Sequence, residues 1–521
     1  MKAGLIAIVS IGILVGLPSL SYPFGRDQGI FALVARTILE GGLPYRDVFD
    51  FKPPGVFYMY AGIQALLSAE PWALRLVDLV WQIATALVLA RLGRKLISPF
   101  GGTASGIIYL ICYYSLGFWY GAQPDGFLVI WVLGFVLLLT GPDAADDGDG
   151  AAAPVALSRI MIRPFLGGVL LGVAAMFKYP AASVLLLALV RVGPASIRLG
   201  ARERLLRFLS ASLGLGVVPA LWVMYAIATG MWNDFYAIEF EFTPKYIGVS
   251  HGGWIDSIYD FLIAIGRGFR LPWWCRAGLV AALLASIYSA RVRRTCAPLL
   301  IGFGLGLIGI IAQGKYFTYQ VIVLLPWYAL LAATVLDLVL RTASDRVDSK
   351  RLTWVLIAGV VLASTPLVAK DWIRWLRSDF GRRTSWLASF TTSDFRASES
   401  DALATYFREQ TRADEAVFIW GFEPQVYLLS DRRCPTRFIY NLPQRAPFAP
   451  DEWKRDLLIE LAADRPALIA VERGDYFPHV LGNTLDSAEA LESFGELRSW
   501  MMANYEPDRI FRRFQVLRRR E

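Results

Sequence analysis

The stretch that decides the fold is residues 25–55, GRDQGIFALVARTILEGGLPYRDVFDFKPPG, a polar segment between two apolar regions. Its apolar side chains recur at helical spacing, at Ile30, Phe31, Val34, Ile38 and Leu39. This spacing predicts a short amphipathic helix over residues 28–40, which is ended by Gly41-Gly42. Asp27 stands at the start of that helix, where a carboxylate can cap the free amides. The segment is too polar to cross a bilayer and is predicted to form an outer loop.

The second half of this loop, YRDVFDFKPPG, ends in a Lys-Pro-Pro turn. Two consecutive prolines stiffen the backbone, so the turn is predicted to hold the Lys52 cation at the membrane face. Asp27 has two interpretations at this point. It is only a helix cap, or it belongs to a functional group with the other charged residues of the loop.

Composition identifies the class of protein. The chain has 521 residues, of which 55% are hydrophobic, and its mean hydropathy is +0.45. Such a chain is typical of a polytopic membrane protein, so the net charge of +8 indicates orientation in the membrane rather than nucleic-acid binding. Four scattered cysteines suggest no disulfide or zinc framework, and two histidines argue against a multi-histidine metal enzyme.

Apolar runs predict about eleven transmembrane helices. The first runs to Leu20 and is expected to stay uncleaved, although Ser19 and Ser21 are small enough for a processing site. The others are residues 73–92, 101–120, 125–141, 163–177, 180–191, 208–229, 274–290, 297–312, 319–340 and 353–370. Residues 56–68 are too short to span and are predicted to lie as a second juxtamembrane helix at the outer surface.

Basic residues favour one orientation. Clusters around Arg91–Lys95, Arg159–Arg163, Arg191–Arg207, Arg291–Arg294 and Arg341–Arg351 all fall on one side, which is the cytoplasm by the positive-inside rule. The acidic piece at residues 142–154 lacks the final Glu of a calcium loop and is interpreted as a solvated cytoplasmic loop. Everything after about residue 370 is then outside.

The remaining polar groups gather on the outer side. They are Asp27, Asp50, Lys52, Gln123, Asp125, Lys178, Glu239, Glu241, Lys245, His251, Arg270, Lys315 and Tyr319, with Arg26 and Tyr45 from the first loop. For each one alone, a capping or snorkelling role is at least as good an explanation. Their common side nevertheless predicts an outward-facing cavity with two acids, Asp27 and Asp125, and several cations.

Such a cavity suits a lipid-linked phosphate. Lys and Arg neutralise a phosphate, and a carboxylate can take a proton from an attacking hydroxyl. The hypothesis is transfer of a sugar from a polyprenyl-phosphate carrier, with no nucleotide donor, because no Gly-rich phosphate loop is present.

The first loop resembles that of the GT-C membrane glycosyltransferases. This group includes the dolichyl-phosphate-mannose protein mannosyltransferases, the lipid A aminoarabinose transferase and, most similar, a bacterial Rgt-type galacturonosyltransferase-like branch. The resemblance implies a catalytic base at Asp27 and a second acid at Asp125. It also implies that Lys52, Lys178 and Lys315 lie near the donor phosphate, and that transfer inverts the anomeric centre.

One position departs from the resemblance. Where the aminoarabinose transferases have a metal-holding Glu before the Lys, this chain has Phe51. Asp50 and His251 are weak substitutes, so no cofactor is expected to be required, although a divalent metal is possible. Arg26, Tyr45, Tyr319, His251 and Arg270 complete the predicted substrate-binding group.

The chain is predicted to divide into a transmembrane catalytic domain (1–370) and an extracytoplasmic α/β domain (371–521). Helices are expected at 399–410, 423–430 and 451–464, and strands at 416–421, 436–440 and 466–473. The basic end RRFQVLRRR is interpreted as a solvated or headgroup-contacting tail. Trp420, Phe422, Tyr440, Asp475 and Tyr476 are candidate sugar contacts, although core or surface aromatics are the simpler explanation.

Three functions are compatible with these observations. The leading hypothesis is a polyprenyl-phosphate-sugar-dependent glycosyltransferase of a bacterial inner membrane, acting on an envelope glycan, glycolipid or protein acceptor at the periplasmic face. The second is a lipid or sugar transporter or flippase, which predicts inverted repeats that the sequence lacks. The third is a non-catalytic assembly partner, in which Asp27 and Asp125 are only caps.

Overall fold

The computed structural model describes residues 2–141, 161–190, 192–193, 199–249, 259, 262, 273–343, 349–392 and 395–521. The chain forms two compact units. The first, here the bundle unit, comprises Met1–Leu20, Arg75–Met224 and Asp260–Arg374. The second, here the mixed unit, comprises Ser21–Leu74, Tyr225–Tyr259 and Trp375–Glu521. The first loop and the C-terminal part of the chain therefore belong to one unit.

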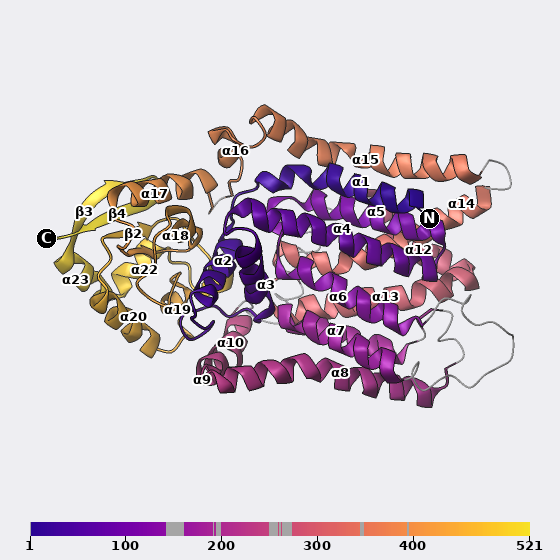
Figure 1. Cartoon of the computed structure of the whole chain (residues 1–521), viewed down its shortest axis with the longest axis horizontal. Coiled ribbons are helices and arrows are strands. Elements are labelled where there is room, and N and C mark those ends of the chain that lie inside the picture. Colours follow the sequence, from indigo (N-terminus) through magenta and orange to yellow (C-terminus); the bar gives the residue numbers. More distant parts are fainter. Residues whose placement is uncertain are drawn as a thin grey trace. The chain divides into compact units, whose positions relative to one another are not determined.

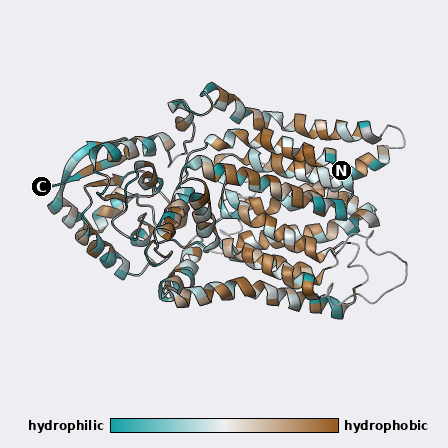
Figure 2. Ribbon diagram, in the orientation of Figure 1, coloured by the Kyte–Doolittle hydropathy of each residue, from teal (hydrophilic) through white to brown (hydrophobic). Residues whose placement is uncertain are grey.

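The bundle unit is a set of helices that run alongside one another (Figure 1). Its α-helices are α1 (Lys2–Gly16), α4 (Pro71–Leu96), α5 (Pro99–Leu116), α6 (Pro124–Leu139), α7 (Arg163–Phe177), α8 (Ala201–Ala228), α12 (Trp273–Tyr288), α13 (Ala290–Gln313), α14 (Leu325–Ala343) and α15 (Ser349–Arg377). Shorter 3₁₀ helices are η1 (Leu17–Ser21), η2 (Phe118–Tyr120), η5 (Tyr179–Leu189) and η8 (Thr318–Leu324). Figure 2 shows that apolar residues cover these helices along most of their length.

Each of the predicted spans coincides with a helix of this unit. Within the described residues, six helices are long and apolar enough to cross a membrane, and four shorter apolar helices accompany them. The span predicted at 180–191 is the 3₁₀ helix η5, and the span predicted at 319–340 begins as the 3₁₀ helix η8. The prediction of a polytopic α-helical membrane protein is confirmed.

Small residues let two of these helices approach closely. A methyl group on Gly168 of α7 would meet the backbone of Ala211, and one on Gly214 of α8 would meet the backbone of Phe165. Because lipid offers no hydrophobic driving force between helices, such close backbone contact is a common basis of packing in membranes.

The mixed unit combines short helices with a small sheet. From the first loop come α2 (Arg26–Leu39) and α3 (Gly55–Leu66), and from the middle of the chain α9 (Trp232–Tyr236), the π-helix η7 (Ala237–Phe242) and α10 (Thr243–Gly248). The C-terminal helices are α16 (Thr384–Ala388), α17 (Ala397–Gln410), α18 (Gln425–Ser430), α19 (Leu442–Arg445), α20 (Glu452–Ala463), α21 (Pro478–Leu481), α22 (Ser487–Ser493) and α23 (Gly495–Asn504).

The sheet has four strands in the order β1-β2-β4-β3. They are β1 (Val417–Trp420), β2 (Leu468–Glu472), β3 (Tyr505–Ile510) and β4 (Phe514–Arg519). Strands β1 and β2 pair in parallel, whereas β4 pairs antiparallel with both β2 and β3. All residues of β1 and β2 are buried, which explains their continuous apolar sequence. The predicted α/β region with a partly parallel sheet is confirmed.

Two local predictions in this region are wrong. Residues 436–440 form bends rather than a strand. The basic end is not a tail, because Phe514–Arg519 is strand β4 between β2 and β3. The side chains of β4 alternate between the two faces of the sheet: Phe514 and Val516 are buried, whereas Arg519 is exposed. The basic residues made this alternation hard to recognise in the sequence.

The predicted amphipathic helix is α2, but its cap differs from the prediction. The N-cap is Gly25, in extended conformation, which has no side chain with which to cap the helix. Asp27 lies inside the first turn, where a carboxylate interacts favourably with the positive end of the helix. Helix α2 packs against α3 and α18.

Candidate functional sites in the two units

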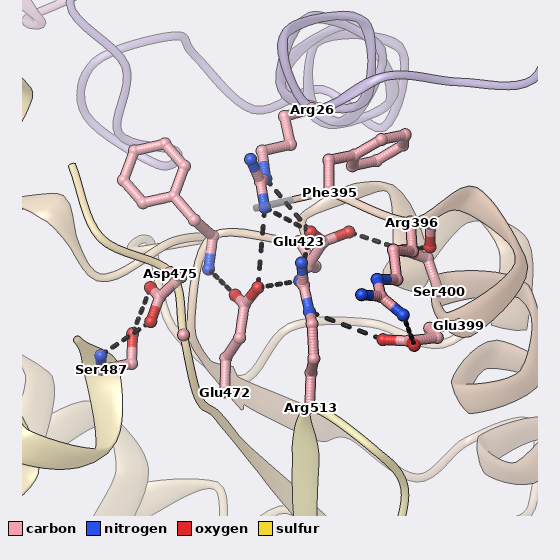
Figure 3. Close-up of polar contacts among 12 residues, drawn as sticks. Arg26, Phe395, Arg396, Glu399, Ser400, Glu423, Glu472, Asp475, Ser487 and Arg513 are labelled. Carbon is pink, nitrogen blue, oxygen red and sulfur yellow. Dashed lines mark hydrogen bonds and ion pairs between the residues drawn. The ribbon is translucent and has the colours of Figure 1, made fainter. Parts of the chain in front are cut away.

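Arg26, the first residue of α2, is anchored in a buried network of charges (Figure 3). Its Nη2 lies 2.7 Å from Glu423 Oε1 and 3.6 Å from Glu472 Oε1, and its Nε donates to Glu423 Oε1 at 3.1 Å. Arg513 approaches the same two glutamates, at 3.0 Å from Glu423 Oε1 and closer still to Glu472. The rings of Phe395 and Phe477 flank the Arg26 guanidinium.

Burial leaves little of this network exposed to a ligand. The side chains of Glu423 and Glu472 are fully buried, and that of Arg26 is only 8% exposed. Burial, together with the charges of Glu423 and Asp475, raises the pKa of Glu472 well above its ordinary value, although Arg26 and Arg513 oppose this shift. The network fixes the N-terminus of α2 against the C-terminal sheet, next to Asp27.

The Lys-Pro-Pro turn is held from inside the first loop. The hydroxyl of Tyr45 donates to the carbonyl of Lys52 at 2.7 Å, and Tyr45 itself has a left-handed backbone (φ 68°). Tyr45 is buried, with its ring against Phe57 and Phe235. Lys52 is partly exposed, and its ammonium lies 3.9 Å from the centre of the Phe51 ring. Tyr45 therefore braces the turn that carries Lys52.

Asp50 is a buried acid of the same turn. Its Oδ1 accepts the hydroxyl of Tyr440 at 2.7 Å, while no donor from the described residues reaches its Oδ2. Burial raises the pKa of Asp50; Lys52 and Tyr440 oppose the shift, and Asp27 adds to it. The charges of Asp27 and Asp50 also act on Tyr246, whose pKa is raised chiefly by burial. The structure thus gathers Asp27, Asp50 and Lys52 within the mixed unit.

A second polar cluster lies in the bundle unit. Asp125, in the first turn of α6, is fully buried, and its Oδ2 lies 2.9 Å from Lys178 Nζ at the end of α7. Lys178 also donates to Gln313 Oε1 at 2.9 Å and lies 5.0 Å from the centre of the Tyr319 ring. Lys315 follows Gln313 by two residues, in the bend between α13 and η8.

This cluster closes one end of an apolar pocket. The pocket has a volume of about 30 Å³ and lies among α6, η5, α13, η8 and α14. Its polar lining comes from Asp125, Lys178, Ser183 and Gln313, and the rest is apolar, including Val129, Val184 and Trp327. Two of the predicted site residues, Asp125 and Lys178, are therefore paired in the structure.

Other predicted residues have different outcomes. His251 and Arg270 lie outside the described residues. Of the candidate sugar contacts, Trp420 is buried with its indole bound to the Ser487 carbonyl, and Asp475 is buried against Arg445. The ring of Phe422 packs at a tilt against Tyr440 and Phe477, and Tyr476 is exposed. In the described part of the chain, no three His, Cys, Asp or Glu side chains group as metal ligands, and the prediction about metal stays a prediction.

Sequence reasoning missed several polar residues that the structure brings together. Glu423, Glu472 and Arg513 carried no local signal, because they meet only through the sheet and α2. Arg75, Asp78 and Gln82 did carry one. They are polar residues at the start of an otherwise apolar predicted span, where ionisable groups are costly and commonly functional.

Comparisons with known proteins agree with this architecture. No protein-family model matches the chain, and no curated protein matches it. Among solved structures, the apo form of ArnT from Cupriavidus metallidurans is 13% identical, with a TM-score of 0.61 over 99% of this chain and 98% of that one. The undecaprenyl phosphate complex of the same protein has a TM-score of 0.59 over 98% and 97% of the two chains at 13% identity.

A third similar structure is the archaeal oligosaccharyltransferase AglB from Archaeoglobus fulgidus, in complex with an inhibitory peptide and a dolichol-phosphate. It is 12% identical, with a TM-score of 0.50 over 90% of this chain and 69% of that one. The chain has the fold of the GT-C membrane glycosyltransferases, as the first-loop motif predicted.

Proposed function

We propose that this protein is a membrane glycosyltransferase that moves a sugar from a polyprenyl-phosphate carrier to an acceptor hydroxyl. The observation that carries the proposal is the buried Asp125–Lys178 pair at the polar end of an apolar pocket. An ammonium beside apolar side chains suits a phosphate attached to a hydrocarbon chain. The fold adds support, since a similar structure of this fold binds undecaprenyl phosphate.

The chemistry follows from the acids and cations. The carboxylate of Asp27 takes the proton of the acceptor hydroxyl while the acceptor oxygen attacks the anomeric carbon. The bond from that carbon to the carrier phosphate breaks, and its electron pair leaves with the phosphate. The cations that the GT-C resemblance assigns to the donor phosphate, Lys52, Lys178 and Lys315, stabilise the developing phosphate charge. Because the acceptor oxygen displaces the phosphate directly, with no covalent intermediate on the enzyme, the transfer inverts the anomeric centre.

The roles in the first loop divide between chemistry and support. Asp27 lies in the first turn of α2 and is half-buried, whereas its neighbour Arg26 is buried. Arg26 and Tyr45 are buried and bound to protein groups, so we assign them to holding Asp27 and Lys52 in place. The site is proposed to face the periplasm of a bacterial inner membrane and to need no metal, with an envelope glycan, glycolipid or protein as acceptor.

The test is turnover of the purified protein in lipid nanodiscs. A panel of undecaprenyl-phosphate sugars and a membrane-extract acceptor would be supplied, and free undecaprenyl phosphate would be followed by mass spectrometry. The Asp27→Asn variant removes the base with little change in shape, so release should fall by a factor of about 10² to 10⁴.

The matched control is Asp431→Asn. Asp431 also touches α2, through Arg36 at 3.0 Å, but it lies on the surface in a left-handed conformation that Asn tolerates. The release of undecaprenyl phosphate by Asp431→Asn should stay within about twofold of that by wild type. Equal release from wild type and Asp27→Asn would refute the assignment of Asp27 as the base.

A further inference from the structure

The turn that leads into α6 has an unusual backbone. Residues 121–123 connect η2 to α6, and Ala122 is held in the left-handed conformation with φ 60°. A residue with a Cβ atom pays for that conformation, so surrounding contacts must impose it. Asp125 follows three residues later, and its direction therefore depends on how this turn is held.

Polar side chains from α4 hold the turn from one side. Arg75 and Asp78 are buried and lie one turn apart on α4. Arg75 Nη1 donates to the carbonyl of Gly121 at 3.0 Å, and the Asp78 carboxylate accepts the backbone N–H of Ala122. The two residues thus grip both polar groups of the peptide that joins Gly121 to Ala122.

Further hydrogen bonds orient Asp78 itself. Its Oδ1 accepts the Tyr113 hydroxyl at 2.8 Å and the Gln82 amide at 3.0 Å. Gln82 is fixed in turn by the Tyr109 hydroxyl, which donates to Gln82 Oε1 at 2.7 Å. We call Arg75, Asp78, Gln82 and Tyr113 the α4 clamp.

The α4 clamp also touches the residue after Asp125. A methyl group placed on Gly126 would lie 3.1 Å from both the Gln82 amide nitrogen and the Tyr113 hydroxyl oxygen. The clamp therefore contacts the chain on both sides of Asp125, whose carboxylate points instead to Lys178.

A purely structural explanation would treat the α4 clamp as a way to bury a polar turn. Such a turn requires only hydrogen-bond partners for its backbone groups. The α4 clamp contains more than that: a buried acid, a buried arginine, and a hydroxyl and an amide that bind the acid. Ionisable groups within a span are costly, and a structural cap could be made from neutral side chains. The contacts on both flanks of Asp125 favour a role in aiming that carboxylate.

We infer that Asp78, with Arg75, Gln82 and Tyr113, is a positioning residue that aims Asp125 at Lys178 through the left-handed turn at Ala122. The inference rests on the proposed function of the Asp125–Lys178 pair.

The test compares Asp78→Asn with Asp337→Asn in nanodiscs. Asp337 is another buried helix carboxylate, and its partners, Ser98 Oγ at 2.5 Å and Arg341 Nε at 2.6 Å, belong neither to the turn at 121–123 nor to the Asp125–Lys178 pair. Turnover would be measured with the undecaprenyl-phosphate sugar panel, and Tm with the same samples. Asp78→Asn should lower turnover at least tenfold and Asp337→Asn less than twofold, at comparable losses of Tm.

Hydrogen exchange supplies a readout that needs no donor. The peptide covering residues 121–126 should exchange at least tenfold faster in Asp78→Asn and unchanged in Asp337→Asn. Wild-type exchange in Asp78→Asn would overturn the inference, as would equal losses of turnover in the two variants. If Asp78→Asn does not fold, Tyr113→Phe is the alternative, because it removes a single hydroxyl donor to Asp78. Tyr113→Phe should lower turnover two- to fivefold and accelerate exchange in residues 121–126. Unchanged exchange in Tyr113→Phe would overturn the inference.

Asp125→Asn separates this inference from the proposed function. Wild-type turnover in Asp125→Asn would show that the Asp125–Lys178 pair is not needed for transfer, and the inference would lose its basis. Loss of turnover in Asp125→Asn together with full turnover in Asp78→Asn would refute the α4 clamp alone.

Discussion

Asp27 and Asp50 occupy different surroundings although both belong to the first loop. Asp27 is half-buried at the positive end of α2, whereas Asp50 is buried against the Tyr440 hydroxyl. Burial favours the neutral form of an acid, and it raises the pKa of Asp50. The two acids of the loop thus differ in exposure, and we propose the more exposed one, Asp27, as the base.

The raised pKa of Asp50 makes a pH-dependent contribution to stability. An acid whose pKa is higher in the folded protein stabilises the fold below its unfolded value, about 3.9, and loses that contribution as the pH rises through the folded value. Asp50→Asn keeps an oxygen acceptor for Tyr440 but cannot ionise. Its stability relative to wild type should therefore increase with pH, by about 1.4 kcal/mol for each unit by which the Asp50 pKa is raised.

Thermal unfolding in nanodiscs between about pH 4.5 and pH 8 measures this difference. Asp431→Asn, which changes an acid whose side chain is 79% exposed, should show a difference from wild type that hardly varies with pH. A constant difference between Asp50→Asn and wild type across this range would contradict the buried state of Asp50.

At the scale of elements, α2 joins the C-terminal region through two kinds of contact. Its first residue, Arg26, belongs to the glutamate network. Its fourth residue, Gly29, lies close to Gln425 of α18. The first contact is electrostatic and the second is steric. Each can be tested separately.

Arg26→Lys keeps the charge but loses the forked donors that reach Glu423. We expect a loss of about 1–3 kcal/mol in the free energy of unfolding, since hydrogen bonds to charged groups are broken in a buried place. Turnover should also fall at least tenfold, because Asp27 is the next residue. Unfolding and turnover assays check both effects.

The control for this change is Arg36→Lys, also on α2. Arg36 pairs with the exposed Asp431, and such surface pairs contribute about 0–1 kcal/mol. If both substitutions have the same effect, the buried network does not fix α2 in the way described.

Gly29 allows α2 to lie directly against α18. A Cβ atom at this position would be 2.8 Å from the Gln425 backbone nitrogen and 2.9 Å from its Cα, so a backbone must move. Gly29→Ala should therefore destabilise the protein by about 1–3 kcal/mol. Gly62→Ala in α3 meets open space and should stabilise it by about 0.5–1 kcal/mol. Changes in Tm of equal sign would refute the close approach.

At the scale of the whole molecule, the chain is an integral membrane protein whose orientation is a prediction from its basic loops. A reporter enzyme that is active only outside the cytoplasm should work when fused after Glu521. The same reporter should be inactive when fused after Ala343, at the end of α14 and within the basic cluster. The reverse pattern in bacterial cells would show that the proposed outer site faces the cytoplasm.

The sequence by itself determined the membrane class, the positions of the apolar helices, the amphipathic α2 and the GT-C resemblance. The first three features depend on apolar length and helical spacing, which are properties of neighbouring residues, and the resemblance depends on the motif of the first loop. Strands β1 and β2 were predicted for the same reason, because each is a short apolar run. Asp125 and Lys178 were identified as polar residues at helix ends, and the structure joins them.

Only the tertiary structure decided which distant residues meet. Arg26 and Glu423 are separated by 397 positions, and no local pattern relates them. Strand β4 exists because β2 and β3 pair with it, despite a basic sequence that resembles a solvated tail. Asp78 grips the turn at Ala122 because α4 lies beside it. Hydrogen bonds and ion pairs of this kind form between segments that folding brings together, so their geometry is absent from the order of residues alone.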